Sequence, residues 1–163
     1  MQEDAEATAR ASRTRSRAPL DPPAVFAGGV GLMVLLALLV PTPSILHGAW
    51  RAAGLLPLGC GILLHRSAWR LFRARGTPIH PESTPRSLVT TGPYSWTRNP
   101  MYLAGCPILL GVALLLGPAA PLLVLPAWIW IVHRHFLPPE ERVLTERFGD
   151  AYRTYQEGVP RWI

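Results

Sequence analysis

The sequence predicts an all-α protein that crosses a lipid bilayer about four times, and two observations support that fold class. Three long segments contain no Asp, Glu, Lys or Arg: residues 22–50, 52–65 and 99–133. The 163-residue chain also has a positive mean hydropathy, with 49% hydrophobic residues. Uncharged segments of this length are typical of membrane helices, because a bilayer core about 30 Å thick needs roughly 20 apolar helical residues. A soluble multidomain enzyme is therefore excluded, and residues 21–163 are expected to form a single membrane domain.

Four membrane spans are predicted, near residues 24–44, 50–68, 100–117 and 120–136. The second has a short apolar segment, and Arg51 and Arg66 are expected to extend it, because long basic side chains can reach the headgroups from within the membrane. The segment 99–133 is too long for one span. Glycine and proline at residues 117–121 interrupt it, which predicts a hairpin of two spans.

The distribution of arginines predicts the orientation in the membrane. All 16 basic residues are arginines, and every one except Arg51 lies before the first span, between spans two and three, or after span four. The positive-inside rule then places both termini and the long proline-rich loop in the cytoplasm, as in an integral protein of the plasma or inner membrane. Residues 1–20 are expected to be a disordered basic cytoplasmic tail. Orientation and attraction to anionic headgroups explain the net charge of +6, so no nucleic-acid partner is expected.

The cysteines and histidines do not predict a metal site. Cys60 and Cys106 both lie within predicted spans, and neither has a neighbouring ligand at metal-binding spacing. His133 and His135 are two residues apart, a spacing that points them to different sides of a helix. We interpret the two histidines as residues of the membrane interface.

A candidate anion site lies at the start of the third predicted span. Asn99 followed by Pro100 is a strong helix start, because asparagine caps free backbone N–H groups and proline at the first helical position sacrifices no donor. Arg98 precedes this helix, so the positive end of the helix dipole and a guanidinium would meet there, which suits a carboxylate or phosphate. The alternative is that Arg98 and Tyr102 only anchor the helix at the headgroups.

Two adjacent carboxylates, Glu140 and Glu141, follow Pro138 and Pro139 where the fourth span leaves the membrane. An acidic pair this close to the membrane surface is unusual, and it offers a charge complementary to that of the Arg98 site. The alternative is a helix N-terminus, because prolines open helices and acidic residues stabilise the first turn. Beyond the pair, a helical stripe is predicted that either lies on the membrane or closes over the middle loop; it consists of Leu144, Phe148, Tyr152 and Tyr155.

The second half of the chain contains GPYSWTRNPMYLAG, then an apolar hairpin, then PPEERVLTERFGDAYRTYQEGVPRWI. This order resembles the membrane-bound isoprenylcysteine carboxyl methyltransferase family, whose bacterial branch is similar to the phospholipid N-methyltransferases. The resemblance covers residues 76–163. It implies a helical membrane enzyme that binds S-adenosylmethionine at the cytoplasmic side and methylates a lipophilic acceptor through a carboxylate, an amine or a thiol.

The resemblance also implies site residues. Arg98 and Glu141 are expected to be catalytic, and the cofactor-binding positions are expected to be Pro93, Tyr94, Arg98, Asn99, Pro100, Tyr102, Glu140 and Glu141. Asn99 stands where some members have histidine, which leaves it a capping role and not one that needs imidazole. The prenylcysteine enzymes place a substrate-binding arginine a few residues ahead of the Glu pair. Here the nearest is Arg134, and residues 136–139 intervene, so prenylcysteine itself is not implied as the acceptor.

The chemistry of the cofactor suits these residue types. S-adenosylmethionine carries a carboxylate, which Arg98 and the start of the third span are expected to hold. It also carries an ammonium and ribose hydroxyls, for which Glu140 or Glu141 would be the acceptor. The aromatic candidates for the adenine ring and the sulfonium are Tyr94, Trp96 and Tyr102. A base is needed only if the acceptor arrives protonated, and for an amine Glu141 is the candidate.

Two other classes of function stay open from the sequence. A related sterol-reductase branch shares the C-terminal architecture but uses a nicotinamide cofactor. A four-span scaffold or transporter subunit would use Arg98 and the Glu pair only as anchors, although the spans lack the buried charges expected of a solute path. The expected partners are the bilayer and a lipophilic small molecule, with no obligate protein partner.

Overall fold

The computed structural model describes residues 21–74 and 87–163, and this part of the chain is built from helices. The predicted tail at residues 1–20 and most of the proline-rich loop, residues 75–86, lie outside the described residues. Within the described part, the β pairing is confined to an isolated bridge between Ser44 and Pro118. The all-α prediction is therefore confirmed for these residues.

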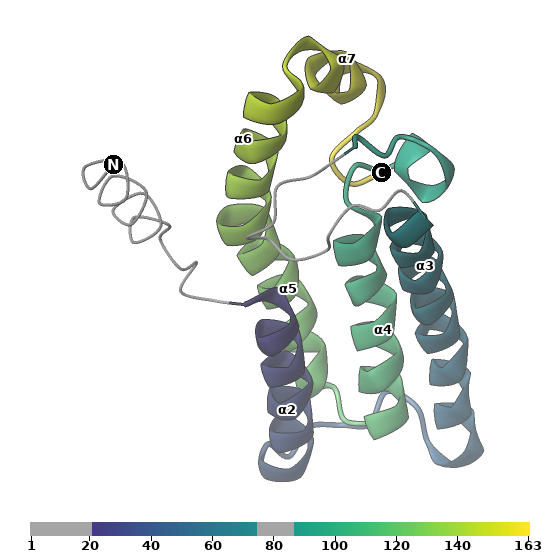
Figure 1. Cartoon of the computed structure of the whole chain (residues 1–163). Helices are drawn as coiled ribbons and strands as arrows, with labels where there is room; N and C mark the ends of the chain where they lie inside the picture. The colour runs from purple at the N-terminus through teal and green to yellow at the C-terminus, as the bar shows by residue number, and fades with distance from the viewer. Residues whose placement is uncertain (1–20, 75–86) are drawn as a thin grey trace, which may run out of the picture.

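Four long helical arms stand side by side, and the shorter C-terminal helix lies across one end of the bundle (Figure 1). The arms are α2 (Pro22–Leu39), α3 (Leu55–Ala74, preceded by the 3₁₀ turn η1, Gly48–Gly54), α4 (Pro100–Leu116) and a continuous stretch of η3 (Ala120–Leu123), α5 (Val124–Ile131), η4 (Val132–Phe136) and α6 (Leu137–Phe148). The C-terminal helix is α7 (Asp150–Gly158), and a 3₁₀ turn, η2 (Gly92–Ser95), precedes α4.

Two of the described helices are long and apolar enough to cross a membrane, Pro22–Leu39 and the stretch Ala120–Phe148. Helix α4 is apolar but has 17 residues. Helix α3 runs to Ala74, six residues beyond the predicted end of the second span, because the arginine-rich sequence after residue 65 continues the helix. The count of four spans stays a prediction.

The arm formed by η1 and α3 packs closely against α4 because glycines lie along their contact. A Cβ added at Gly111 would lie 2.6 Å from the Gly54 carbonyl oxygen, and one at Gly61 would lie 2.8 Å from the Ala104 carbonyl oxygen. Small residues allow helix backbones to approach in a membrane, where van der Waals contact replaces the hydrophobic effect as the source of association. Glycine is therefore required at these positions.

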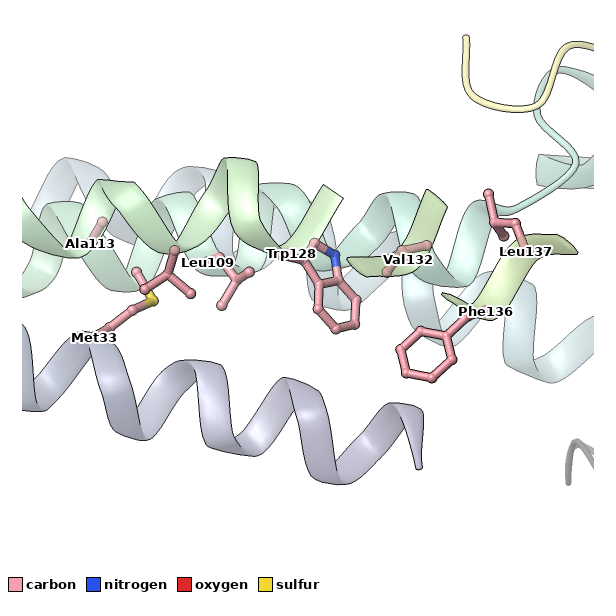
Figure 2. Close-up of a cluster of buried hydrophobic side chains, with 8 residues drawn as sticks. Met33, Leu109, Ala113, Trp128, Val132, Phe136 and Leu137 are labelled. Carbon is pink, nitrogen blue, oxygen red and sulfur yellow. The ribbon is translucent and has the colours of Figure 1, made fainter. Parts of the chain in front are cut away.

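The main hydrophobic core lies between α2, α4 and the stretch that contains α5 (Figure 2). It contains Met33 from α2, Leu109 and Ala113 from α4, and Trp128 from α5, all buried. Trp128 has the largest side chain of this set, and its ring meets Phe26 edge-on at 5.1 Å. These contacts pack α5 against α4, and they thereby determine the level along the bundle at which the residues after α5 lie.

The turn between α4 and η3 falls where the sequence predicts one. Gly117 ends α4 with a φ of 99°, a left-handed conformation that glycine adopts without strain. The guanidinium of Arg51 packs against this glycine, where a Cβ would lie 2.5 Å from the Arg51 Cζ. The two arms joined by this turn are antiparallel, so the start of α4 and the end of α5 lie at the same end of the bundle (Figure 1).

The fourth helical arm continues beyond residue 136, where the fourth span is predicted to end, so the alternative of a separate helix that begins at the prolines is not supported. The helix continues through Pro138 and Pro139 to Phe148. Proline lacks an N–H group and its ring clashes with the carbonyl four residues earlier, so it normally breaks an α-helix. Here the wider π-helical turn η4 lies directly before the prolines and absorbs the mismatch. The Glu pair therefore lies within a long helix and not at a free helix end.

Candidate functional site

Arg98 and Glu141 meet at one end of the bundle, although 43 residues separate them. Arg98 lies two residues before α4, and Glu141 lies in the first half of α6. The Arg98 Nη1 is 3.1 Å from the Glu141 Oε1, with side-chain exposures of 12% and 13%. The antiparallel hairpin and the uninterrupted helix after it bring the two motifs to the same level.

Glu141 has a second arginine partner near the C-terminus. Arg161 donates from Nε to Oε1 at 2.9 Å and from Nη2 to Oε2 at 2.5 Å, a two-pronged contact that uses both carboxylate oxygens. Such a fork is stronger and more directional than a single ionic contact. Glu141 is therefore held by two cations and has little freedom to turn toward another group.

Arg98 has hydrogen-bond donors that are not used within the site. Its Nε and Nη1 atoms are buried and have no hydrogen-bond partner among the described residues, so the contact between Nη1 and Glu141 is electrostatic without an aligned hydrogen bond. A buried charged donor without an acceptor costs free energy. The side chain is thus suited to receive an additional anionic acceptor. Tyr152 lies next to it, where burial raises the pKa of the tyrosine and the Arg98 charge opposes that rise.

Glu140 has a different environment from its neighbour. The Tyr102 hydroxyl donates to its Oε1 at 2.5 Å, and the Tyr102 ring stacks on Phe136 with centroids 6.0 Å apart. Glu140 lies beyond the apolar part of the helix, which ends before Arg134. Burial raises the pKa of Glu140 to about 7, the Tyr102 hydrogen bond opposes this, and the Glu141 charge adds to it. Glu140 is therefore the carboxyl of the pair that can hold a proton near neutral pH.

The predicted side-chain cap by Asn99 is not formed. Helix α4 does begin at Pro100, and the Asn99 carbonyl accepts from the Leu103 N–H at 2.9 Å, but the Asn99 side chain makes no capping hydrogen bond. Its Nδ2 instead donates to the Arg161 carbonyl at 2.9 Å. The C-terminal segment competes for this side chain, and a sequence window around Asn99 carries no information about a contact 62 residues away.

Pro93 and Tyr94 lie in the turn η2, outside the cluster formed by Arg98, Glu141 and Arg161. Tyr94 is buried against α3, where its ring lies 5.4 Å from that of Phe72. Its carbonyl accepts from the Tyr155 hydroxyl at 2.6 Å, which ties α7 to the loop before α4. Trp96, the remaining aromatic candidate, is 45% exposed.

The C-terminal aromatic stripe closes over the loop before α4, one of the two arrangements that the sequence allows. The stripe is divided between two helices, because Gly149 has a φ of 53° and breaks the helix between α6 and α7. Tyr152 is 1% exposed, and Tyr155 makes the contact with the loop. Predicted site residues from both motifs are thereby covered by α7.

Arg161 is a site residue that sequence reasoning missed. In the sequence it reads as one more arginine on the cytoplasmic side, 20 positions after Glu141. A signal does exist in the neighbours: the arginine stands between Pro160 and Trp162, directly after the last helix. Such a segment has little reason to combine proline, arginine and tryptophan unless it packs against something.

Comparison with known proteins shows the family of the chain. The model of the phospholipid methyltransferase family matches residues 50–151, well over half of the chain. The chain therefore belongs to the phospholipid methyltransferase family. The resemblance noted in the sequence is confirmed.

Two relatives and one solved structure are similar to it. A protein-S-isoprenylcysteine O-methyltransferase of Schizosaccharomyces pombe is 34% identical over 76 residues, which are 47% of this chain and 32% of the relative. An uncharacterized protein of Haemophilus influenzae is 36% identical over 63 residues, which are 39% of this chain and all of that protein. The eukaryotic intramembrane Ras methyltransferase ICMT shares the fold, with a TM-score of 0.60 at 23% identity over 85% of this chain and 50% of that one. The chain thus spans about a third of the yeast enzyme and half of the solved one.

Proposed function

We propose that this protein transfers a methyl group from S-adenosylmethionine to a lipophilic acceptor at the cytoplasmic end of the bundle. The observation that carries the proposal is the buried Arg98, whose Nε and Nη1 make no hydrogen bond in the described protein, although Nη1 has an ionic contact with Glu141. Membership of the family supports methyl transfer, and the donor set of the site fits the cofactor. The acceptor class stays a carboxylate, an amine or a thiol.

The residues of the site fit the polar groups of S-adenosylmethionine, which supplies a methyl group activated by a sulfonium. Arg98 would hold the carboxylate through its two unmatched donors. Glu140 would accept from the ammonium or a ribose hydroxyl through the oxygen that Tyr102 leaves free. The remaining proposed cofactor-binding positions are Pro93, Tyr94, Asn99, Pro100 and Tyr102, while Glu141 would act through the two arginines that it contacts.

In this site the protein contributes orientation, exclusion of water and a place for a proton. Orientation alone can supply roughly 7 to 11 kcal/mol of a reaction barrier when both reactants are held in line. For an amine acceptor that arrives protonated, one N–H bond must break, and the proton needs a base. Glu140 suits this role better than Glu141, the choice from the sequence, because two arginines already occupy the carboxylate of Glu141 while burial raises the pKa of Glu140.

The apolar part of an acceptor has a candidate recess next to the site. A cavity of about 160 Å³ lies between α2, α4 and α5, and its lining includes Phe26, Leu32, Leu109, Trp128 and Ile131. Trp128 connects this recess to the polar site, since its Nε1 donates to the Tyr102 carbonyl at 3.4 Å. The recess supports an acceptor with a hydrocarbon chain.

The direct test is to measure the binding of S-adenosylhomocysteine to the purified protein in detergent by calorimetry. We expect saturable binding, and transfer of a labelled methyl group from S-adenosylmethionine into a lipid extract of the source membranes. Arg98→Ala should abolish both, whereas Arg147→Ala, an exposed arginine of α6, should change neither. Binding of a nicotinamide dinucleotide with no binding of S-adenosylhomocysteine would support the reductase alternative. Binding of neither ligand would support the scaffold.

We also propose that the site faces the cytoplasm, as the arginine distribution predicts. Cysteine labelling in intact cells tests this, after Cys60 and Cys106 are replaced by alanine. Glu157→Cys on α7 should be protected from an impermeant thiol reagent, and Ala49→Cys in the connection before α3 should react with it. The opposite pattern would invert the orientation.

A further inference from the structure

The C-terminal segment is clamped onto the start of α4 by main-chain contacts. The Arg98 N–H donates to the Pro160 carbonyl at 3.0 Å. The Arg161 carbonyl accepts from the Asn99 Nδ2 at 2.9 Å and from the Thr97 Oγ1 at 3.3 Å. Thr97 is fully buried, and Trp162 packs against the main core. The backbone of Arg161 is therefore held from both sides, and its side chain reaches Glu141 from this position.

That side chain determines how the Glu141 carboxylate is used. Arg161 takes both oxygens in the fork, while Arg98 contacts Glu141 through Nη1 alone, and its Nε and Nη1 make no hydrogen bond among the described residues. A carboxylate and a guanidinium prefer to pair through two parallel hydrogen bonds. Without Arg161, Glu141 would be free to rotate and make that pair with Arg98, and the unmatched donors would be consumed.

Removal of Arg161 also changes the net charge of the cluster of Arg98, Glu141 and Arg161, and this change too would weaken the binding of an anion. Two guanidinium groups and one carboxylate leave a net positive charge at a mostly buried place, which attracts an anion. Removal of Arg161 makes the cluster neutral. Both effects lower the affinity of Arg98 for an anionic ligand, and neither requires Arg161 to touch that ligand.

We propose that Arg161 is a positioning residue of the site, which holds Glu141 in the fork and so keeps the Arg98 guanidinium available for the carboxylate of the cofactor. The inference rests on the proposed function and adds a residue to it. Arg161 acts through Glu141, so its effect depends on that carboxylate and on the charge of the ligand.

The test compares two ligands that differ at the group Arg98 would hold. S-adenosylhomocysteine carries the amino-acid carboxylate and ammonium, and 5′-methylthioadenosine is a related thioether that lacks both, so the loss specific to the first ligand reports on its amino-acid end. Arg161→Ala is expected to weaken S-adenosylhomocysteine at least about tenfold and 5′-methylthioadenosine less than about twofold. Arg161→Lys should lie between Arg161→Ala and the native protein, because an ammonium restores the charge but not the fork. Arg147→Ala is the matched control and should leave both affinities unchanged.

A double-mutant cycle adds a measurement that a purely structural role would not move. In the Glu141→Gln background, Arg161→Ala should weaken S-adenosylhomocysteine less than about threefold, because the competing carboxylate is gone. Equal losses for the two ligands, additive effects in the cycle, or native affinity in Arg161→Ala would each overturn the proposal while leaving the proposed function intact. Failure of the native protein to bind S-adenosylhomocysteine would overturn the proposed function and this inference with it.

Discussion

Replacement of Glu141 by glutamine is expected to destabilise the folded protein. Glu141 is the only carboxylate between Arg98 and Arg161 in the described structure, with contacts of 3.1 Å to one and 2.5 to 2.9 Å to the other. Glutamine keeps the shape but removes the charge. Two guanidinium groups would then face each other, one of them largely buried.

The size of the loss follows from the exposure of each partner. Removing one member of a buried ion pair typically costs about 3 to 5 kcal/mol, whereas an exposed pair contributes about 1 kcal/mol or less. Arg98 is 12% exposed and belongs to the first class, while Arg161 is 33% exposed and its share must be discounted. The amide retains part of the hydrogen bonding, so we expect a loss of about 3 kcal/mol. For a chain of this length that corresponds to a melting temperature lower by roughly 6 to 12 °C.

Thermal denaturation in detergent, followed by tryptophan fluorescence, measures this loss directly, with Glu140→Gln as the matched control. The control keeps an oxygen that accepts from Tyr102 and removes no ion pair, so it should melt close to the native protein at neutral pH. A Glu141→Gln protein of native stability that has lost only its affinity for S-adenosylhomocysteine would refute the reasoning. It would mean that Glu141 is a free acceptor for the cofactor, as the sequence suggests.

Three further outcomes are expected. Burial raises the pKa of Glu140 to about 7, so the folded state binds this proton more tightly than the unfolded chain does. The free energy of unfolding should therefore fall as the pH rises from about 5 to about 8. In denaturation curves measured across this range, Glu140→Gln should show a weaker dependence on pH. Gly61→Ala should lower the free energy of unfolding by about 1 to 3 kcal/mol, because the added Cβ would lie 2.8 Å from a backbone oxygen of α4. Gly59→Ala is the control in the same melting assay and should leave stability unchanged, because nothing lies within 4 Å of its Cβ. Equal stability of the two variants would contradict the close α3–α4 contact. Tyr155→Phe should lower stability by about 1 kcal/mol through loss of the hydrogen bond to the Tyr94 carbonyl, and unchanged protection from proteolysis at α7 would show that this contact does not hold the helix.

Several features of this protein were determined by the sequence alone. Long uncharged segments have few physical solutions other than helices in a bilayer, so the all-α class followed from composition. The turn after α4 followed from glycine and proline at residues 117–121, whose backbone preferences are local. The candidate residues Arg98 and Glu141 were found because two short motifs stand in a family's order on either side of a hairpin.

Only the tertiary structure decided how those residues are used. Proline predicts a helix end when it is considered locally, but the π turn before Pro138 let the helix continue and carried Glu141 past the bundle to Arg98. The different environments of Glu140 and Glu141 depend on which helix each side chain faces, and adjacent positions in a sequence give no information on that. The role of Arg161 depends on a chain segment returning across 62 residues to Asn99, a contact set by packing and not by any local preference.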